Sequence, residues 1–159
     1  MTTTPEFLQQ LRKTSLFREF TEDEICCCLD LLDRQQAKPE ECIVRQDERG
    51  DSMYLIVEGR VRVLRHDNGR TVELAELVPG DFFGEIALVD EGPRSADVEA
   101  ITECTLFRIT QATISALAGV YPTVAFKFLI AVGRVLVERM RQTNRRYVDS
   151  LLFPVTGNN

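Results

Sequence analysis

The 159-residue sequence contains a single histidine, His66. A catalytic metal centre on a β fold needs several histidines and a carboxylate around one ion, so one histidine argues against redox-metal chemistry. Phosphodiester hydrolysis would need a metal or an activated nucleophile, and the sequence offers neither constellation. We therefore expect a protein that is not an enzyme and holds no metal, with His66 as a solvated residue in a hairpin loop.

Long hydrophobic runs are also absent. No apolar stretch approaches the roughly 18 residues that mark a membrane-spanning helix. The first residues, MTTTPEFLQQ, lack the basic end and the apolar block of a secretory signal. We expect a cytoplasmic protein with no membrane span, and its length and 44% apolar composition suit one domain.

Paired cysteine spacing is missing as well. The five cysteines are an odd number, and Cys26, Cys27 and Cys28 would point in different directions from one helix. This pattern favours neither a disulfide framework nor a metal cluster. We expect small, buried or half-buried thiols of the kind found in a reducing cytosol.

Positive charge is scarce, because the net charge is -6. An acidic balance argues against broad nucleic-acid binding, which requires a basic surface. The cations that exist gather near the end of the chain. Their position is typical of a solvated helix end, where the helix dipole favours cations, and a phosphate- or membrane-binding role is the alternative. These residues are Arg134, Arg139, Arg141, Arg145 and Arg146.

Residues 1–35 form a predicted helical lead-in. Residues 6–13 can form a short helix. Thr21 and Glu24 have the spacing of a capping box, which predicts the start of a helix over residues 22–33.

Residues 36–110 change to short β-rich runs separated by turns. Asn68-Gly69 is a strong hairpin signal, because both positions tolerate positive φ. Runs at this spacing predict a sandwich, jelly roll or barrel rather than a parallel sheet, so the fold class is mainly β with flanking helices. The runs are ECIVRQ, SMYLIVEG, RVRVLRHD, RTVELAEL, SADVEAI and CTLFRIT.

Residues 111–150 return to helical periodicity, with residues 151–159 as a tail. A short helix covers residues 111–120, and Pro122 suits the first turn of a long helix over residues 123–150. One apolar stripe of the long helix can cover the β domain and comprises Ala125, Phe128, Val132 and Leu136. A second apolar set needs another surface and comprises Phe126, Leu129, Ile130 and Val137.

A second copy of the chain is the expected cover for this second set. Closed symmetric dimers are the commonest oligomers, so the long helix predicts a homodimer. Cover from elsewhere in the same chain is the alternative.

The segment FFGEIALVDEGPRSADVEA places Glu85 and Arg94 around a turn of small residues. Gly84 permits close backbone approach, so the turn after it can present N–H groups to an anion. Ionised Glu85 only accepts hydrogen bonds, which suits a sugar diol, and the Arg94 guanidinium matches a phosphate. Ser95 supplies a hydroxyl next to Arg94, and the small side chains of Ala87 and Ala96 leave room for a ligand. The segment therefore predicts a nucleotide monophosphate site, and the alternative is that Glu85 and Arg94 pair with each other or face water.

The stretch FGEIALVDEGPRSADV resembles the phosphate-binding cassette of the cyclic nucleotide-binding domain family, which includes the catabolite activator protein and the regulatory subunits of protein kinase A. The family pattern is F-G-E, an aliphatic residue and A-L, then after a short spacer P-R, a small residue and A. The spacer here fits without a gap. SLFREFTEDEI, GDSMYLIVEGRVRV and VPGDFFGE extend the likeness. The resemblance implies an eight-stranded β roll, or jelly roll, with N-terminal helices and a long C-terminal helix.

The resemblance also implies a role for each cassette residue. Glu85 would accept a hydrogen bond from the ribose 2′-hydroxyl, and Arg94 would neutralise the cyclic phosphate. Arg139, on the long helix, would contact or cap the purine. The phosphate contacts would be completed by Ser95 and by the N–H groups of Ile86 and Ala87, and the pocket by Phe83, Gly84 and Ala96.

The implied function is a receptor for cAMP, or for cGMP, that signals through movement of its C-terminal helix. The cyclic nucleotide would be the ligand, and no cofactor is expected. A hydroxyl at Ser95 can reach either a phosphate or a guanine edge, and we favour cAMP. Relatives that activate transcription continue into a helix-turn-helix domain, which is not found in this sequence, so no DNA binding is expected. The alternatives are a scaffold that keeps the fold without a ligand and a fragment of a longer regulator.

Overall fold

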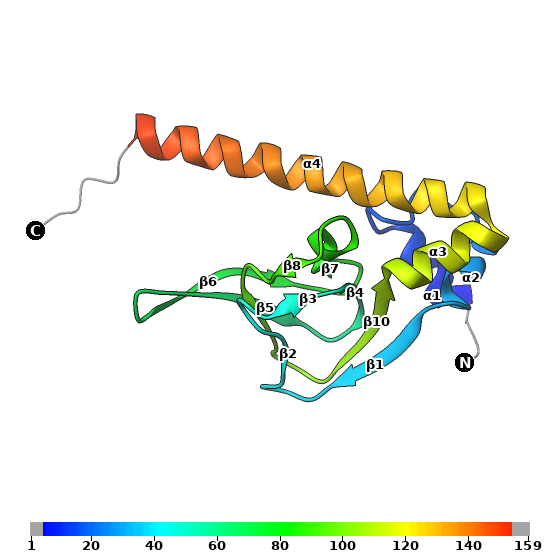
Figure 1. Cartoon of the computed structure of the whole chain (residues 1–159), viewed down its shortest axis with the longest axis horizontal. Coiled ribbons are helices and arrows are strands. Elements are labelled where there is room, and N and C mark those ends of the chain that lie inside the picture. Colours follow the sequence, from blue (N-terminus) through cyan, green and yellow to red (C-terminus); the bar gives the residue numbers. More distant parts are fainter. Residues whose placement is uncertain (1–4, 154–159) are drawn as a thin grey trace, which may run out of the picture.

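The computed structural model describes residues 5–153 and shows a β roll with α1, α2 and α3 at one end and the long helix α4 along one side (Figure 1). The helices are α1 (Pro5–Arg12), α2 (Glu22–Leu29), the 3-10 turn η1 (Glu85–Leu88), α3 (Gln111–Val120) and α4 (Pro122–Leu152). The strands are β1 (Asp33–Ala37), β2 (Cys42–Val44), β3 (Arg49–Gly50), β4 (Ser52–Glu58), β5 (Val61–Asp67), β6 (Arg70–Leu77), β7 (Phe82–Phe83), β8 (Gly92–Pro93), β9 (Asp97–Ala100) and β10 (Cys104–Thr110). Residues 154–159 of the expected tail lie outside the described residues.

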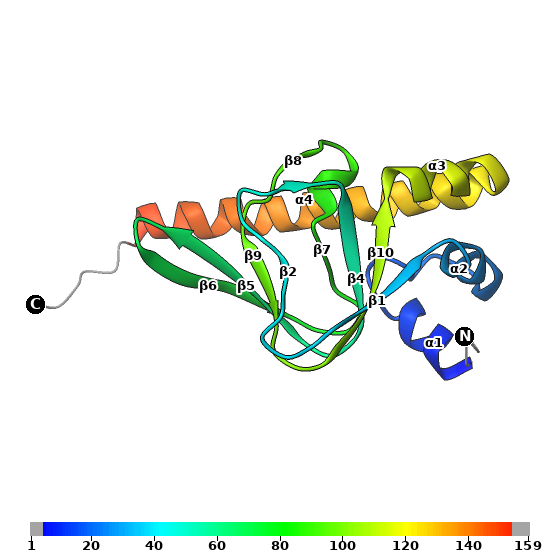
Figure 2. The same cartoon turned by 60° about the horizontal axis from the view of Figure 1, so that its bottom comes forward.

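Two four-stranded antiparallel sheets make up the roll (Figure 2). Their strand orders are β1-β10-β4-β7 and β2-β9-β5-β6. The expectation of an eight-stranded β roll with flanking helices is confirmed. A further two-stranded pair, β3 with β8, was not predicted, because each of its strands is only two residues long.

The helix predicted over residues 22–33 extends four residues beyond the end of the observed helix α2. Its start is confirmed, since Thr21 and Glu24 form both hydrogen bonds of the capping box. The helix ends at Leu29 because the chain then turns and enters β1, whose Asp33 pairs with Arg108 of β10. Sheet pairing therefore overrides the local helical pattern.

His66 does not lie in the hairpin loop, which corrects the sequence prediction. It is in β5 opposite Thr71, and its ring nitrogens lie 2.9 Å from Thr71 Oγ1 and 2.9 Å from Asp97 Oδ2. The turn itself is Asn68-Gly69, with φ of 48° and 75°, so the hairpin prediction is confirmed. Hydrogen bonds from Gln46 N–H and His66 lower the pKa of Asp97, chiefly through Gln46.

The cysteines are free thiols, buried or half-buried as expected. Burial raises the pKa of Cys28 to about 12, which leaves its thiol protonated and unreactive at neutral pH. Residues 5–153 contain no group of three His, Cys, Asp or Glu side chains placed to hold a metal ion. None of the helices in that range could cross a membrane.

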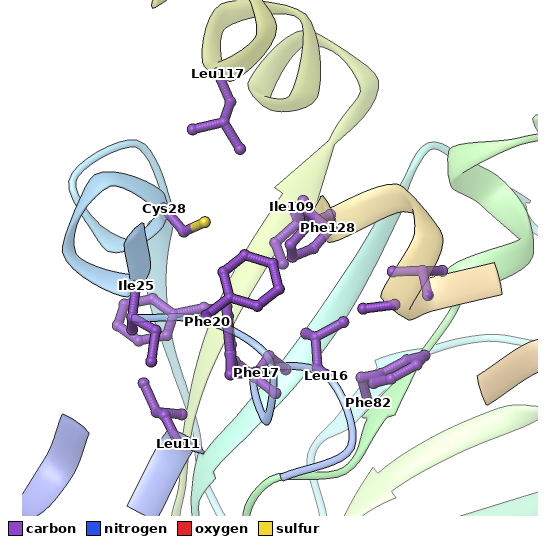
Figure 3. Close-up of a cluster of buried hydrophobic side chains, with 14 of the residues drawn as sticks. Leu11, Leu16, Phe17, Phe20, Ile25, Cys28, Phe82, Ile109, Leu117 and Phe128 are labelled. Carbon is purple, nitrogen blue, oxygen red and sulfur yellow. The ribbon is translucent and has the colours of Figure 1, made fainter. Parts of the chain in front are cut away.

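The main hydrophobic cluster joins the lead-in helices to α4 (Figure 3). Phe17 lies at its centre, with ring centroids 5.3 Å from Phe20 and 6.4 Å from Phe128. Lys127 of α4 adds an ion pair with Glu24, at 2.6 Å. The first half of α4 is therefore fixed by buried contacts with the lead-in.

The two expected faces of α4 are confirmed. Ala125, Phe128 and Val132 are buried, and Leu136 is partly buried against the main cluster. The other apolar set is between 41% and 65% exposed and comprises Phe126, Leu129, Ile130 and Val137. Within residues 5–153, no other segment covers this second face.

Candidate functional site

The turn between β7 and η1 depends on Gly84. Its φ of 75° is in the left-handed region, which favours glycine, and it directs the chain from Phe83 into the 3-10 turn. A Cβ at this position would also lie 2.7 Å from Arg94 Nη1 and 2.9 Å from Ser52 O. Glycine is therefore required here for both backbone shape and close approach.

The Arg94 backbone is held by two hydrogen bonds next to the short β3–β8 pair. Its N–H donates to Glu48 O at 2.8 Å, and its carbonyl accepts from Asp47 N–H at 2.9 Å. From this fixed backbone the side chain crosses Gly50, where a Cβ would lie 2.1 Å from Nε and 2.2 Å from Cζ. Gly50 and Gly84 together form the bed on which the guanidinium lies.

Among the described residues, the hydrogen-bond partners of the Arg94 guanidinium are neutral. Nη1 donates to Gly84 O at 3.2 Å, and Nη2 donates to Ser52 Oγ at 3.4 Å. Within residues 5–153 no carboxylate forms a salt bridge with it, so the pairing of Glu85 with Arg94 that sequence left open does not occur. Burial lowers the pKa of Arg94, although arginine remains charged at any physiological pH. A half-buried cation that forms no salt bridge among the described residues favours an anionic ligand.

Glu85 pairs instead with Arg139 of α4. Arg139 Nη1 lies 2.5 Å from Glu85 Oε1, and Nη2 donates to Phe82 O at 2.7 Å. The guanidinium also stacks over the Phe82 ring, 4.8 Å from its centroid. The Glu85 side chain is 10% exposed and that of Arg139 is 37% exposed, so the pair lies at the edge of the interior.

A cavity of about 460 Å³ lies between the β roll and α4. All nine site residues predicted from the sequence line it, from Phe83 to Ala96 and including Arg139. Glu85, Ala87 and Ala96 are buried, whereas Ser95 and Ile86 lie at the exposed rim. The Ala87 N–H donates to Gly84 O at 3.2 Å, closing the 3-10 turn.

Sequence reasoning missed several residues of this cavity. Gly50 leaves space for the Arg94 side chain and Ser52 accepts a hydrogen bond from it, although both are more than 40 residues away in sequence. The glycine of ERGD was the only local sequence feature that pointed to this segment. Gln142, Thr143 and Arg146 of α4 also line the cavity. They follow Arg139 by three, four and seven residues, which places them on the same face of the helix. Once Arg139 is assigned to the cavity, helical spacing therefore predicts that these three residues line it too.

The family model of the cyclic nucleotide-binding domain matches residues 34–120. The matched residues include Gly50, Glu85 and Arg94 but end before α4. The chain is 32% identical over 152 residues to the cyclic AMP receptor protein of Thermus thermophilus, covering 93% of this chain and 67% of that protein. It is 39% identical over 100 residues to a cAMP-dependent protein kinase regulatory subunit of Dictyostelium discoideum, covering 59% of this chain and 31% of the subunit.

Among solved structures, the catabolite activator protein of Thermus thermophilus superposes with a TM-score of 0.77 at 31% identity. The match covers 88% of this chain and 64% of that one. The chain thus spans about one third to two thirds of the relatives it matches.

Gly50→Ala should push the Arg94 guanidinium off its bed, because the added methyl would overlap Nε and Cζ. Since those atoms belong to the movable end of a side chain, the cost to the free energy of unfolding should not exceed about 1–3 kcal/mol. A crystal structure of the variant tests the displacement and urea unfolding tests the cost.

Gly119→Ala in α3 is the matched control for Gly50→Ala. No atom lies within 4 Å of its added Cβ, so it should stabilise the helix by roughly 0.5–1 kcal/mol. An Arg94 side chain that stays in place in the Gly50→Ala variant would refute the account of the bed.

Proposed function

Because the chain belongs to the cyclic nucleotide-binding domain family, we propose that it is a receptor for a cyclic nucleotide, with cAMP favoured over cGMP. The observation that carries this proposal is Arg94, a half-buried guanidinium beneath a cavity with only neutral partners. A ligand-free scaffold would gain nothing from burying this charge. A cyclic phosphate supplies the missing anion, and a charge-assisted hydrogen bond is about twice as strong as a neutral one.

The ribose would bind at Glu85. A carboxylate only accepts hydrogen bonds, so it suits the 2′-hydroxyl as donor. Glu85 lines the same cavity as Arg94 and begins the 3-10 turn that Gly84 initiates. Phosphate and sugar would thus be recognised by two residues at the two ends of the segment that contains η1 and β8.

Signalling would occur through α4. This helix supplies one wall of the cavity, including Gln142, Thr143 and Arg146, while the β roll supplies the rest. A ligand that contacts both walls stabilises their closed arrangement by the contacts it makes only there. The proposed output is a change in the position of α4, read by a partner protein or by a second copy of the chain.

The second copy would bind along the exposed face of α4. Uncharged residues recur there at alternating spacings of four and three, which is the heptad pattern of a coiled coil. The apolar side chains in this seam are between 41% and 65% exposed. A Cβ added at Gly133 would meet no atom within 4 Å. The seam comprises Phe126, Ile130, Gly133, Val137, Met140, Asn144, Tyr147 and Leu151.

Asn144 favours one geometry for this dimer. A polar asparagine at a core position of a coiled coil selects the register in which it meets its counterpart. Two α4 helices bring Asn144 together with Asn144 of the second copy when they run parallel and in register. We therefore propose a parallel homodimer. An open groove of about 860 Å³ beside Leu129, Ile130 and Val137 leaves room for the second helix.

Added cAMP should raise the melting temperature. Ligand at about 100 times its dissociation constant adds about 2.7 kcal/mol to the free energy of unfolding, which corresponds to roughly 5–10 °C for a chain of this size.

Arg94→Ala should weaken binding by about 2–5 kcal/mol, or roughly 30- to 4000-fold, because the phosphate would be left unpaired. Calorimetry with cAMP and cGMP measures both effects.

Arg145→Ala is the control for Arg94→Ala, since Arg145 is exposed on α4 and does not line the cavity. It should bind cAMP as the wild-type chain does. The receptor proposal fails if neither nucleotide at millimolar concentration shifts the melting temperature of the wild-type chain.

Val137→Glu should convert the dimer to a monomer, because it buries a charge in the centre of the seam. Arg145→Glu changes the charge of the same helix away from the seam and should leave the dimer intact. Sedimentation at tens of micromolar distinguishes the two variants. A wild-type chain that sediments as a monomer with and without nucleotide would contradict the dimer.

A further inference from the structure

An ion pair that does not line the cavity lies next to the bed of Arg94. Arg108 of β10 donates from Nη2 to both carboxylate oxygens of Asp51, each at 3.0 Å. Asp51 joins β3 to β4, and its neighbours in the chain are Gly50 and Ser52. The Arg94 side chain lies against both of these neighbours. The pair of Asp51 and Arg108 is therefore adjacent to the candidate phosphate site.

Ser52 connects this ion pair to Arg94. It is only 1% exposed, and its Oγ accepts a hydrogen bond from Arg94 Nη2 at 3.4 Å. The same hydroxyl forms a hydrogen bond with the Asp51 carboxylate, which is the main reason that the pKa of Asp51 lies below its ordinary value. Asp51 is therefore ionised at neutral pH, and one hydroxyl separates its charge from the Arg94 guanidinium.

Two opposite charges thus act on Arg94 from outside the cavity. Burial lowers the pKa of Arg94, the Asp51 carboxylate opposes this effect, and the Arg108 cation reinforces it more weakly. Arg108 holds Asp51 in an ion pair, and among the described residues Asp51 forms no salt bridge with Arg94. Because the pair is neutral overall, the single positive charge of Arg94 is left for a ligand.

We propose that Asp51 and Arg108 are specificity-determining residues that match the site to a phosphate with one negative charge. The proposal rests on the proposed function and deepens it. A cyclic phosphate is a diester with one negative charge, whereas a phosphate monoester such as 5′-AMP carries about −1.5 to −2 at pH 7. Arg94 balances the first charge, and the Asp51 carboxylate repels the second. The site would therefore prefer a cyclic nucleotide to its linear hydrolysis product.

The two members of the pair have opposite effects on this preference. Removal of the Asp51 charge makes the surroundings of Arg94 more positive by one charge, and removal of the Arg108 charge makes them more negative by one. Because Coulomb energy is proportional to the charge of the ligand, a dianion responds to either change about twice as strongly as a monoanion. The ratio of cAMP affinity to 5′-AMP affinity therefore reports the charge around Arg94.

The experiment is competition calorimetry on the full chain at neutral pH and low ionic strength, in which 5′-AMP displaces cAMP. In Asp51→Asn the preference for cAMP over 5′-AMP should fall about 3- to 10-fold, the effect of one charge near a protein surface. In Arg108→Met the preference should rise by a similar factor. The double variant Asp51→Asn/Arg108→Met restores the net charge and should return the preference to within about twofold of wild type.

The 5′-methyl ester of AMP separates the charge of the phosphate from the shape of its ring. This ligand is linear like 5′-AMP but carries one negative charge like cAMP, so its affinity relative to cAMP should be the same in wild type and in Asp51→Asn. Asp67→Asn is the matched control variant. Asp67 is an exposed carboxylate of β5 that does not line the cavity, and its removal should leave the preference for cAMP over 5′-AMP unchanged.

Three results overturn the proposed role while leaving the receptor proposal intact. They are a wild-type preference in both Asp51→Asn and Arg108→Met, a double variant that does not restore it, and a methyl ester that gains as much as 5′-AMP in Asp51→Asn. A wild-type chain that binds neither cAMP nor cGMP overturns both proposals. Melting curves without ligand verify that each variant is folded, and Arg108→Gln supplies the test if Arg108→Met is not.

Discussion

A half-buried guanidinium that forms no salt bridge within the described residues is the constraint on which the site depends. Arg94 reaches its position only because Gly50 and Gly84 carry no side chain, and its backbone is fixed by two hydrogen bonds next to the β3–β8 pair. Removing part of its hydration has a cost that the neutral partners Gly84 O and Ser52 Oγ offset incompletely. The fold thus holds a charge whose best partner is an anion from outside the chain.

The two halves of α4 are held by different forces, and this difference gives the helix its proposed role. The first half buries Phe128 in the main cluster and is fixed by hydrophobic contact. The second half is connected to the β roll, within the described residues, by the hydrogen bonds of Arg139. Contacts of this kind are easily altered by a ligand, whereas a packed aromatic core is not. Movement is therefore expected beyond Leu136, over the cavity.

Much of this arrangement could be predicted from sequence because it is encoded locally. The segment from Glu85 to Arg94 predicted that these two residues face one pocket, and the stripe of Ala125, Phe128 and Val132 predicted the buried face of α4. The Glu85–Arg139 pair could not be found, because 54 residues separate its members and no local pattern links them. The role of Gly50 was missed for the same reason, since its need for a missing Cβ becomes visible only when Arg94 lies across it. The strand β1 was missed because its pairing with β10 overrode a helical pattern.

The most direct test is a crystal structure of the chain with cAMP bound. The account predicts a phosphate oxygen within about 2.7–2.9 Å of an Arg94 guanidinium nitrogen, the distance of a charge-assisted hydrogen bond. It also predicts that the cyclic phosphate lies in the cavity between η1 and α4. A nucleotide bound elsewhere, with Arg94 still bonded only to Gly84 O and Ser52 Oγ, would contradict the account.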